Sequence, residues 1–127
     1  MVMQQRQSYD IDLGVRYGFL ELIDTDAIAR AATSRWSNQS LCTVNDCVIR
    51  LGVVEGEFHW HKHDREDEFF LVLSGELAID LDDGTTVRLQ PGQGYAVPRG
   101  QVHRTRAAVR TVMLMVEGGT VEPTGDG

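Results

Sequence analysis

The sequence lacks several features that would assign it to a particular class of protein. No apolar run among its 127 residues approaches the roughly 20 residues that a membrane-spanning helix requires. The opening MVMQQRQSYD lacks the basic and then apolar pattern of a secretory signal. The net charge is -7, so the chain has no surplus of cationic side chains with which to bind nucleic-acid phosphates. We therefore expect a cytoplasmic protein that binds neither a membrane nor nucleic acid.

Cysteine is also scarce, with Cys42 and Cys47 as the two examples. The dipeptide Asn45-Asp46 predicts a two-residue turn between them, in which Cys42 would face Ile49 and not Cys47. The two thiols would then not be cross-strand neighbours, and we expect both to be free. Their spacing also differs from the CxxC pattern of redox and zinc sites.

From residue 39 onward the chain consists of short β-rich runs separated by turn residues. The runs are SLCTV, CVIRLGVV, FHWHKH, EFFLVLS, ELAIDL, TTVRLQ, YAVP and RTVMLMV. Asp83-Gly84 predicts a two-residue hairpin, and Pro91-Gly92 predicts another tight turn. Strands and helices do not alternate, which disfavours a doubly wound α/β fold. The pattern predicts an all-β domain, either an antiparallel sandwich or a closed barrel.

The two ends of the chain differ from this β-rich middle. Residues 1–35 are expected to form an N-terminal arm, in which DAIARAA favours a short helix capped by Asp24 or Thr25. Residues 36–118 hold the β-rich runs and are expected to form the barrel. Residues 119–127 are expected to form a loose C-terminal tail.

Two histidines stand close together in WHKHDREDE, residues 60–68. Side chains two residues apart on a strand project to the same face, so His61 and His63 would point together. Glu68 opens the next run, and its carboxylate would face both imidazoles if the two strands pair. Such a set suits divalent iron, manganese, nickel or zinc, and His103 is placed to close the site. The histidine pair by itself also fits a solvated loop.

These residues resemble the first motif of the cupin superfamily. That motif has a glycine, then HxH, three or four residues, a glutamate, six residues and a second glycine. His61, His63, Glu68 and Gly75 match it, and Gly56 lies one residue closer to the histidines than the usual first glycine.

The second cupin motif is matched in full. It consists of a glycine, five residues, Pro-x-Gly, two residues and a histidine, and here these are Gly92, Pro98, Gly100 and His103. Ala107 replaces the asparagine that often stands four residues after that histidine. The two motifs together are far more specific than either one.

The resemblance implies a double-stranded β-helix, or jelly-roll barrel, that is commonly a dimer and holds a metal inside. It implies that His61, His63, Glu68 and His103 bind one divalent ion per chain, which would be Fe, Zn, Mn or Ni. The sequence is most similar to small single-domain RmlC-like cupins described as mannose-6-phosphate isomerase-like, through TVND, EDEFFLVLSGEL and VPRG.

Two neighbouring acids are alternatives to Glu68. Glu66 and Asp67 lie in the same loop, and Asp67 fits the three-residue variant of the spacing. The six-residue distance to Gly75 favours Glu68, and Asp67 is then expected to cap or brace the loop.

His59 departs from the family pattern, which usually has an apolar residue there. It is expected to share the inward face of His61 and His63, where it could be a base near the metal, a substrate contact or an alternative ligand. The favoured interpretation is a barrel-core histidine with a satisfied hydrogen bond, because one further pleat places it several ångströms from the ion.

Several apolar side chains are expected to face away from the metal. Trp60, Phe69, Leu71 and Leu73 have this phase, so the outer face of their sheet should be covered by the N-terminal arm or by a second subunit. This is our reason to expect a homodimer. Five arginines include candidates for an anion-binding residue, although solvated strand faces explain most of them: Arg50, Arg88, Arg104, Arg106 and Arg110.

The fold leaves the activity open, because one barrel can support many chemistries. We expect a metal-binding cupin of small-molecule metabolism, with the ion serving as a Lewis acid or an oxygen-activating centre for a small oxygenated substrate. Isomerase and dioxygenase chemistry both fit the donor set. The alternative is a non-catalytic module that binds or senses a small ligand.

Overall fold

The computed structural model describes residues 8–126, so residues 1–7 of the expected arm and residue 127 of the expected tail lie outside the described part. Within it, the elements follow in this order: β1 (Asp10–Asp12), α1 (Thr25–Ala31), β2 (Trp36–Val44), β3 (Cys47–Glu57), β4 (Glu68–Ser74), β5 (Leu77–Leu81), β6 (Thr86–Leu89), β7 (Gly94–Val97) and β8 (His103–Gly118). No helix among residues 8–126 has the length and apolar character needed to cross a membrane.

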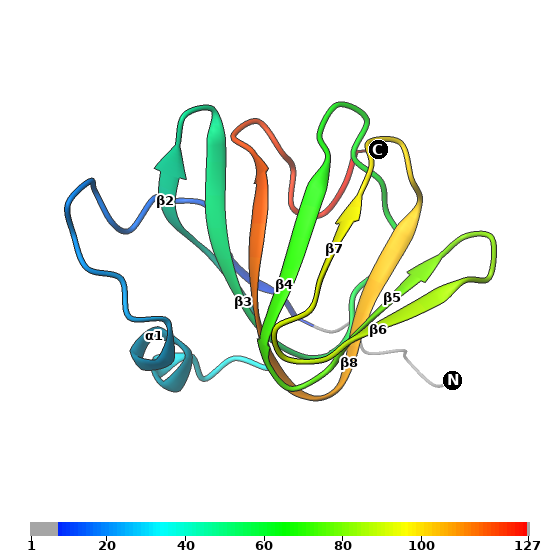
Figure 1. Cartoon of the computed structure of the whole chain (residues 1–127), viewed down its shortest axis with the longest axis horizontal. Coiled ribbons are helices and arrows are strands. Elements are labelled where there is room, and N and C mark those ends of the chain that lie inside the picture. Colours follow the sequence, from blue (N-terminus) through cyan, green and yellow to red (C-terminus); the bar gives the residue numbers. More distant parts are fainter. Residues whose placement is uncertain (1–7, 127) are drawn as a thin grey trace, which may run out of the picture.

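The strands form the predicted double-stranded β-helix, with β8 at its centre (Figure 1). One run of neighbours is β1-β2-β3-β8-β4-β7, and β5 pairs with both β6 and β8. The beginning of β8 pairs with β5, from His103 to Arg106, whereas its later part pairs with β4, from Val112 to Glu117. β8 therefore belongs to both walls of the barrel and joins them.

Two apolar layers follow from the alternation of side chains along these strands. The barrel interior is formed mainly by Trp36, Val54, Phe58, Phe70, Val72, Leu77, Ile79, Leu89, Val97, Met113 and Met115. A second layer lies outside, where Ile28 and Ala29 of α1 pack on Leu41, Leu51 and Val53. The predicted helix is thus confirmed, and the side chain of Asp24 caps it by accepting a hydrogen bond from the Ala27 amide at 3.1 Å.

The hairpin between β2 and β3 has the predicted register. Cys42 lies opposite Ile49, and both cysteines are free. Asn45 occupies the left-handed region with φ of 51°, which asparagine tolerates in such turns.

The turn between β5 and β6 is wider than predicted. Asp80 pairs with Thr86, and the Leu81 amide donates to the Thr85 carbonyl, so the loop contains three residues and not two. Gly84 still provides the positive φ, at 91°. The glycine was recognised correctly, but its position within the turn was wrong, because loop length depends on the pairing of the flanking strands.

The outer face of β4 remains partly uncovered. Phe69 is 39% exposed and Leu73 is 37% exposed, while Trp60, in the preceding segment, is 45% exposed. In the described part of the N-terminal arm, residues 8–35, the helix α1 packs over β2 and β3 and not over β4. A second subunit on this face stays a prediction.

Candidate metal centre

The four side chains that the sequence pointed to lie together inside the barrel. One potential ligand atom from each of His61, His63, Glu68 and His103 lies within 4.8 Å of all the others. His63, Glu68 and His103 are buried, and His61 is half-buried. Glu68 is the first residue of β4 and His103 is the first residue of β8, so strand ends position two of the four.

The histidine pair does not lie on a regular strand, and this corrects the expected hairpin. Residues 58–67 form a connecting segment in which a single bridge pairs His61 with His103. Each of these two amides donates to the other residue's carbonyl at 2.9 Å. β4 pairs with β7 and β8 and not with this segment, so Glu68 reaches the histidines from the opposite wall. The candidate site therefore lies between the two walls of the barrel.

Backbone carbonyls fix the orientation of two imidazoles. The Nδ1 of His61 lies 2.9 Å from the His59 carbonyl, and the Nδ1 of His103 lies 2.9 Å from the Gln101 carbonyl. A carbonyl can only accept a hydrogen bond, so each Nδ1 carries the proton and each Nε2 keeps a lone pair in the neutral ring. Both Nε2 atoms are thereby available to a metal.

The donor set fits a cation. The Nε2 atoms of His103 and His63 lie 3.1 Å and 3.6 Å from the same oxygen of Glu68. Both ring nitrogens of His63 are buried and have no hydrogen-bond partner among the described residues. Lone pairs of nitrogen and a carboxylate oxygen that converge in a buried space repel one another unless a cation or a proton lies between them.

The protonation of the site also favours a cation. Burial lowers the pKa of His61 to about 4, so its imidazole is neutral at neutral pH. Burial alone would raise the pKa of Glu68, but the neighbouring imidazoles of His103 and His63 hold it well below its usual range. Burial likewise opposes the charged form of His63, but the Glu68 carboxylate outweighs it and raises the pKa of that imidazole. The carboxylate of Glu68 is therefore negatively charged and lies among the imidazoles of the site.

Glu117 is a buried acid that the sequence analysis missed. It lies directly opposite Glu68 in the pairing of β4 with β8 and is 2% exposed. Burial, together with the charge of Glu68, raises the pKa of Glu117, so it is protonated at neutral pH. The signal was its place in the alternation Met113, Met115, Glu117, which assigns the acid to the inward face of β8.

Arg50 is also inside the barrel, unlike the other arginines considered. Its guanidinium donates to the Asn38 side chain at 2.7 Å and to the Ser40 hydroxyl at 2.8 Å. Burial lowers the pKa of Arg50, and the negative charge of Glu68 opposes this effect.

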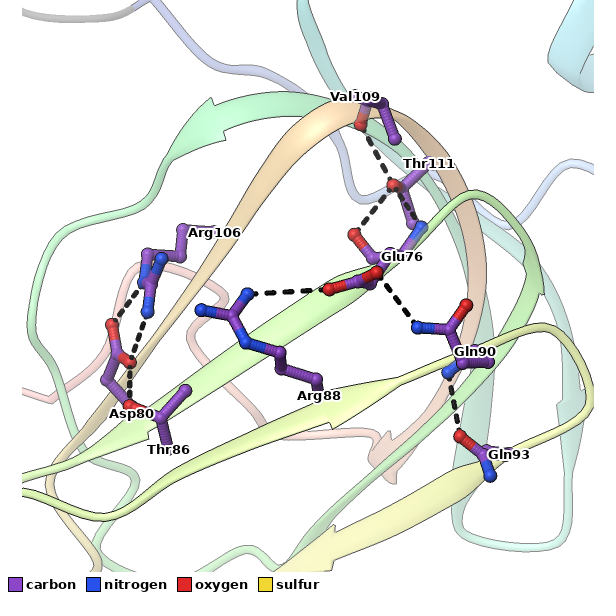
Figure 2. Close-up of polar contacts among 9 residues, drawn as sticks. All are labelled: Glu76, Asp80, Thr86, Arg88, Gln90, Gln93, Arg106, Val109 and Thr111. Carbon is purple, nitrogen blue, oxygen red and sulfur yellow. Dashed lines mark hydrogen bonds and ion pairs between the residues drawn. The ribbon is translucent and has the colours of Figure 1, made fainter.

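The remaining arginines are held by acids or carbonyls on the barrel surface. Figure 2 shows Arg106 paired with Asp80 and Arg88 paired with Glu76. Arg104 also pairs with Asp80, and Arg110 donates to two carbonyls near the end of α1. These contacts explain the positions of all four arginine side chains without an anionic ligand.

The cavity beside the site is small and has both apolar and polar lining residues. It has a volume of about 20 Å³, which is close to the space that one water molecule needs. Its lining consists of Trp36, Asn38, Phe58, His61, Glu68, Phe70, Thr105, Met113, Met115 and Pro123. A larger hollow of about 770 Å³ lies nearby, between the β2–β3 turn, the loop before β4 and the end of β8. Its walls include Glu68 and Glu117 together with Phe69 and Val116 from the outer face of the sheet, and none of the three site histidines.

His59 does not share the inward face, contrary to expectation. It is exposed, and its Nε2 lies 2.6 Å from the carbonyl oxygen of Thr124. The histidine has its satisfied hydrogen bond, but it lies outside the core and outside the group of four. Asp67 braces the neighbouring turn as predicted, by accepting a hydrogen bond from the Arg99 amide at 2.9 Å.

The last residues are not a loose tail. Residues 119–126, which we call the C-terminal strap, turn back from the end of β8 toward the segment that carries the histidine pair (Figure 1). Val121 is 7% exposed, and Pro123 lines the small cavity. The glycines and the proline suggested a loose end because the partners of this stretch lie about sixty residues away in sequence.

A family profile decides the relationship of the chain to known proteins. The profile of the cupin domain matches residues 48–117. The chain belongs to the cupin family. The matched region of this cupin includes all four residues of the candidate metal centre, and the assignment to the mannose-6-phosphate isomerase-like subgroup stays a prediction.

Similar proteins support the same assignment. The uncharacterized protein YdbB of Bacillus subtilis (strain 168) is 47% identical over 91 residues, which are 72% of this cupin and 80% of the relative. A cupin-2 domain protein of Shewanella frigidimarina superimposes with a TM-score of 0.72 and 32% identity, over 76% of this chain and 94% of that one. Hydroquinone 1,2-dioxygenase of Sphingomonas sp. TTNP3 shares the fold, with a TM-score of 0.71 and 21% identity, over 80% of this chain and 33% of that one.

Proposed function

We propose that this cupin is a metal-dependent dioxygenase. Its small substrate would have an oxygen atom that can bind the metal and an otherwise apolar or aromatic structure. The observation that carries the proposal is the position of the four converging ligands beside a cavity whose lining includes Trp36, Phe58 and Phe70. In such a reaction both atoms of dioxygen enter the substrate, so the step needs no external reductant.

The four residues of the site would hold one divalent ion. His61, His63, Glu68 and His103 supply three nitrogen donors and one oxygen donor, a set that suits iron, manganese, nickel or zinc. When bound, the ion would supply a Lewis acid and an oxygen-activating centre. Buried Glu117, protonated beside Glu68, keeps that ligand in its anionic form.

The cavity lining favours an oxygenase over an isomerase. An isomerase that moves a proton between carbon atoms needs a general base within hydrogen-bond reach of the substrate. The titratable groups that line the cavity are His61 and Glu68, and both belong to the proposed metal site. His59 could have supplied a base, but its Nε2 is engaged by the Thr124 carbonyl outside the core.

The other lining residues suit an apolar or aromatic body. Trp36 and Phe58 are stacked with their ring centres 5.3 Å apart, and Phe70 lines the same space. Rings of this kind bind flat apolar groups well. The Asn38 amide and the Thr105 hydroxyl could orient a polar substituent. No lysine or arginine is among the lining residues, so we do not propose a sugar phosphate as the substrate.

Elemental analysis combined with oxygen uptake tests the proposal. Protein purified without a chelating tag should contain about one metal ion per chain. With iron bound, it should consume oxygen in the presence of a small phenol such as a hydroxybenzoate, and His103→Ala should abolish the uptake. Bound zinc with no oxygen uptake, together with thermal stabilisation by the same phenols, would instead indicate a non-catalytic binding module.

A further inference from the structure

The cavity beside the metal site is too small for the substrate class proposed above. Its volume of about 20 Å³ can hold one water molecule but no aromatic ring. Pockets that bind small organic ligands have volumes of roughly 300 Å³ or more. Some part of the cavity wall must therefore move before a substrate can enter.

The C-terminal strap is the part of this wall that is held least firmly. The other lining residues lie on strands or in the connecting segment of residues 58–67, whereas Pro123 comes from the strap. Strands are fixed by ladders of hydrogen bonds, and segments with few scattered bonds open at a lower free-energy cost. Gly119 directly follows β8, and its amide donates to the Asp46 carbonyl at 2.8 Å, so a movement of the strap would begin beyond this residue.

Isolated contacts hold the end of the strap. The Thr124 carbonyl lies 2.6 Å from His59 Nε2, and the Asp126 amide donates to the Lys62 carbonyl at 2.8 Å. The Asp126 carboxylate accepts a hydrogen bond from the Asp64 amide at 2.7 Å. The contacts at His59 and Asp64 flank the histidine pair, so the end of the strap lies against the segment that carries it.

Gly125 shows how closely the strap approaches a proposed ligand. Its φ is 94°, and a Cβ added there would lie 2.5 Å from the Cβ of His61. A side chain at this position would push the strap away from the histidine. The closed state thus requires a glycine, and it covers His61 from the side on which Pro123 lines the cavity.

We propose that the C-terminal strap is a movable wall of the metal cavity, which opens to admit the substrate and closes over it. The proposal rests on the proposed function for the nature of the substrate. His59 and Asp126 latch the strap, so the family-atypical histidine is a positioning residue that acts through the Thr124 carbonyl. Pro123 limits the space that remains around the substrate when the strap closes.

Tryptophan fluorescence can report on strap opening without any metal. Trp36 lines the cavity and is 2% exposed, and Trp60 is the other tryptophan of the chain. In a Trp60→Phe background, quenching by acrylamide therefore measures access to the cavity. The second readout is the rate at which a chelator removes zinc from the zinc-loaded full chain.

Variants of the two latch residues should increase both readouts. Asp126→Ala and His59→Ala each remove one contact of the strap, and each should speed zinc removal and Trp36 quenching about tenfold. Asp126→Asn keeps an acceptor for the Asp64 amide and should restore values close to wild type. Glu122→Ala is the matched control, because Glu122 lies in the strap with an exposed side chain and should change neither rate.

The outcomes separate this proposal from the proposed function. If both latch variants leave Trp36 quenching and zinc release unchanged, the strap is a fixed wall and the proposal is wrong. If they lower the amount of zinc bound at saturation, the strap belongs to the site itself and the proposal is again wrong. A chain that binds no metal, but whose latch variants increase quenching, would retain the strap proposal and overturn the proposed function.

Discussion

Glu68 and Glu117 face each other across β4 and β8, and the protonated carboxyl group of Glu117 stabilises the ionised one of Glu68. The pairing places two acids where one charge can be tolerated. It also lowers the stability of the metal-free protein as the pH rises from about 5 to about 9.

The pH dependence follows from the raised pKa of Glu117. The folded, metal-free protein keeps a proton that the unfolded chain releases near the ordinary pKa of a glutamate, about 4.3. The associated stability is complete below that pKa and is lost as the pH rises toward the raised value. Glu117→Gln cannot ionise, so its advantage over wild type in urea unfolding should grow between about pH 5 and about pH 9. An unchanged difference across this interval would show that Glu117 does not titrate as inferred.

The candidate ligands should differ sharply from His59 in their effect on metal content. His61→Ala or His103→Ala removes a donor, and metal content should fall from about one ion per chain to near none, with a lower melting temperature. His59→Ala should leave the equilibrium metal content nearly intact, because its imidazole contacts Thr124 and not the site. Elemental analysis after dialysis measures this. Loss of metal from the His59 variant would mean that the ligand set is wrong.

Gly75 and Gly84 provide a matched pair of turn glycines. Both have positive φ, but a Cβ at Gly75 would lie 2.5 Å from Thr111 Oγ1, whereas a Cβ at Gly84 would contact nothing within 4 Å. Gly84→Ala should cost about 1 kcal/mol of unfolding free energy through backbone strain alone. Gly75→Ala adds a steric clash and should cost about 3 kcal/mol or more. Equal losses in urea unfolding would argue against the close packing of this turn on β8.

Asp80 should contribute to stability at neutral pH. It is 6% exposed and accepts hydrogen bonds from Arg106, Arg104 and Thr86 (Figure 2 shows the first and the last). Arg106 is the main reason that the pKa of Asp80 lies well below its usual range. The associated stability is present above the ordinary aspartate pKa of about 3.9 and is lost as the pH falls below it.

Asp80→Asn should therefore lower the free energy of unfolding by about 2 kcal/mol at neutral pH. The difference from wild type should shrink in acid, as the wild-type carboxylate also loses its charge. Asp82→Asn makes the same change of charge at an exposed site and should have a smaller effect. A constant difference between Asp80→Asn and wild type at all pH values would contradict the account.

The exposed apolar face of β4 should form a homodimer interface. Phe69 and Leu73 are partly exposed there, and apolar patches of this kind usually mark contacts between proteins. Leu73→Glu should convert a dimer into a monomer in light-scattering measurements. Val109→Glu changes an exposed position on a different strand, β8. It is the control and should leave the mass of the dimer unchanged. A wild-type chain that is monomeric at high concentration would rule out this interface.

The spacing of the motifs predicted the fold and the group of four candidate ligands. Gly75, Gly92 and Gly100 have positive φ and lie between strands where the pattern requires turns, so the chemistry of single residues was sufficient there. The same spacing identified His61 and His103, which the structure brings to opposite sides of one bridge.

The features that sequence analysis missed depend on contacts between distant parts of the chain. Glu117 becomes significant through its register with Glu68, and no local pattern specifies which strands pair. The histidine pair was expected on a strand because His61 and His63 alternate correctly, but its segment crosses between two walls and joins no ladder. The strap looked loose because Asp64 and His59, which hold it, are remote in sequence.

The central position of β8 has a consequence for the order in which this protein can fold. Three of the proposed ligands precede residue 70, but the fourth opens the long strand that also holds β3, β4 and β5 together. During synthesis a nascent chain that has already exposed its histidine pair and Glu68 cannot complete the pocket until β8 has left the ribosome. Pairings over such large sequence separations form slowly. Any ion captured earlier would be held by an incomplete set of donors and could exchange until the last strand docks.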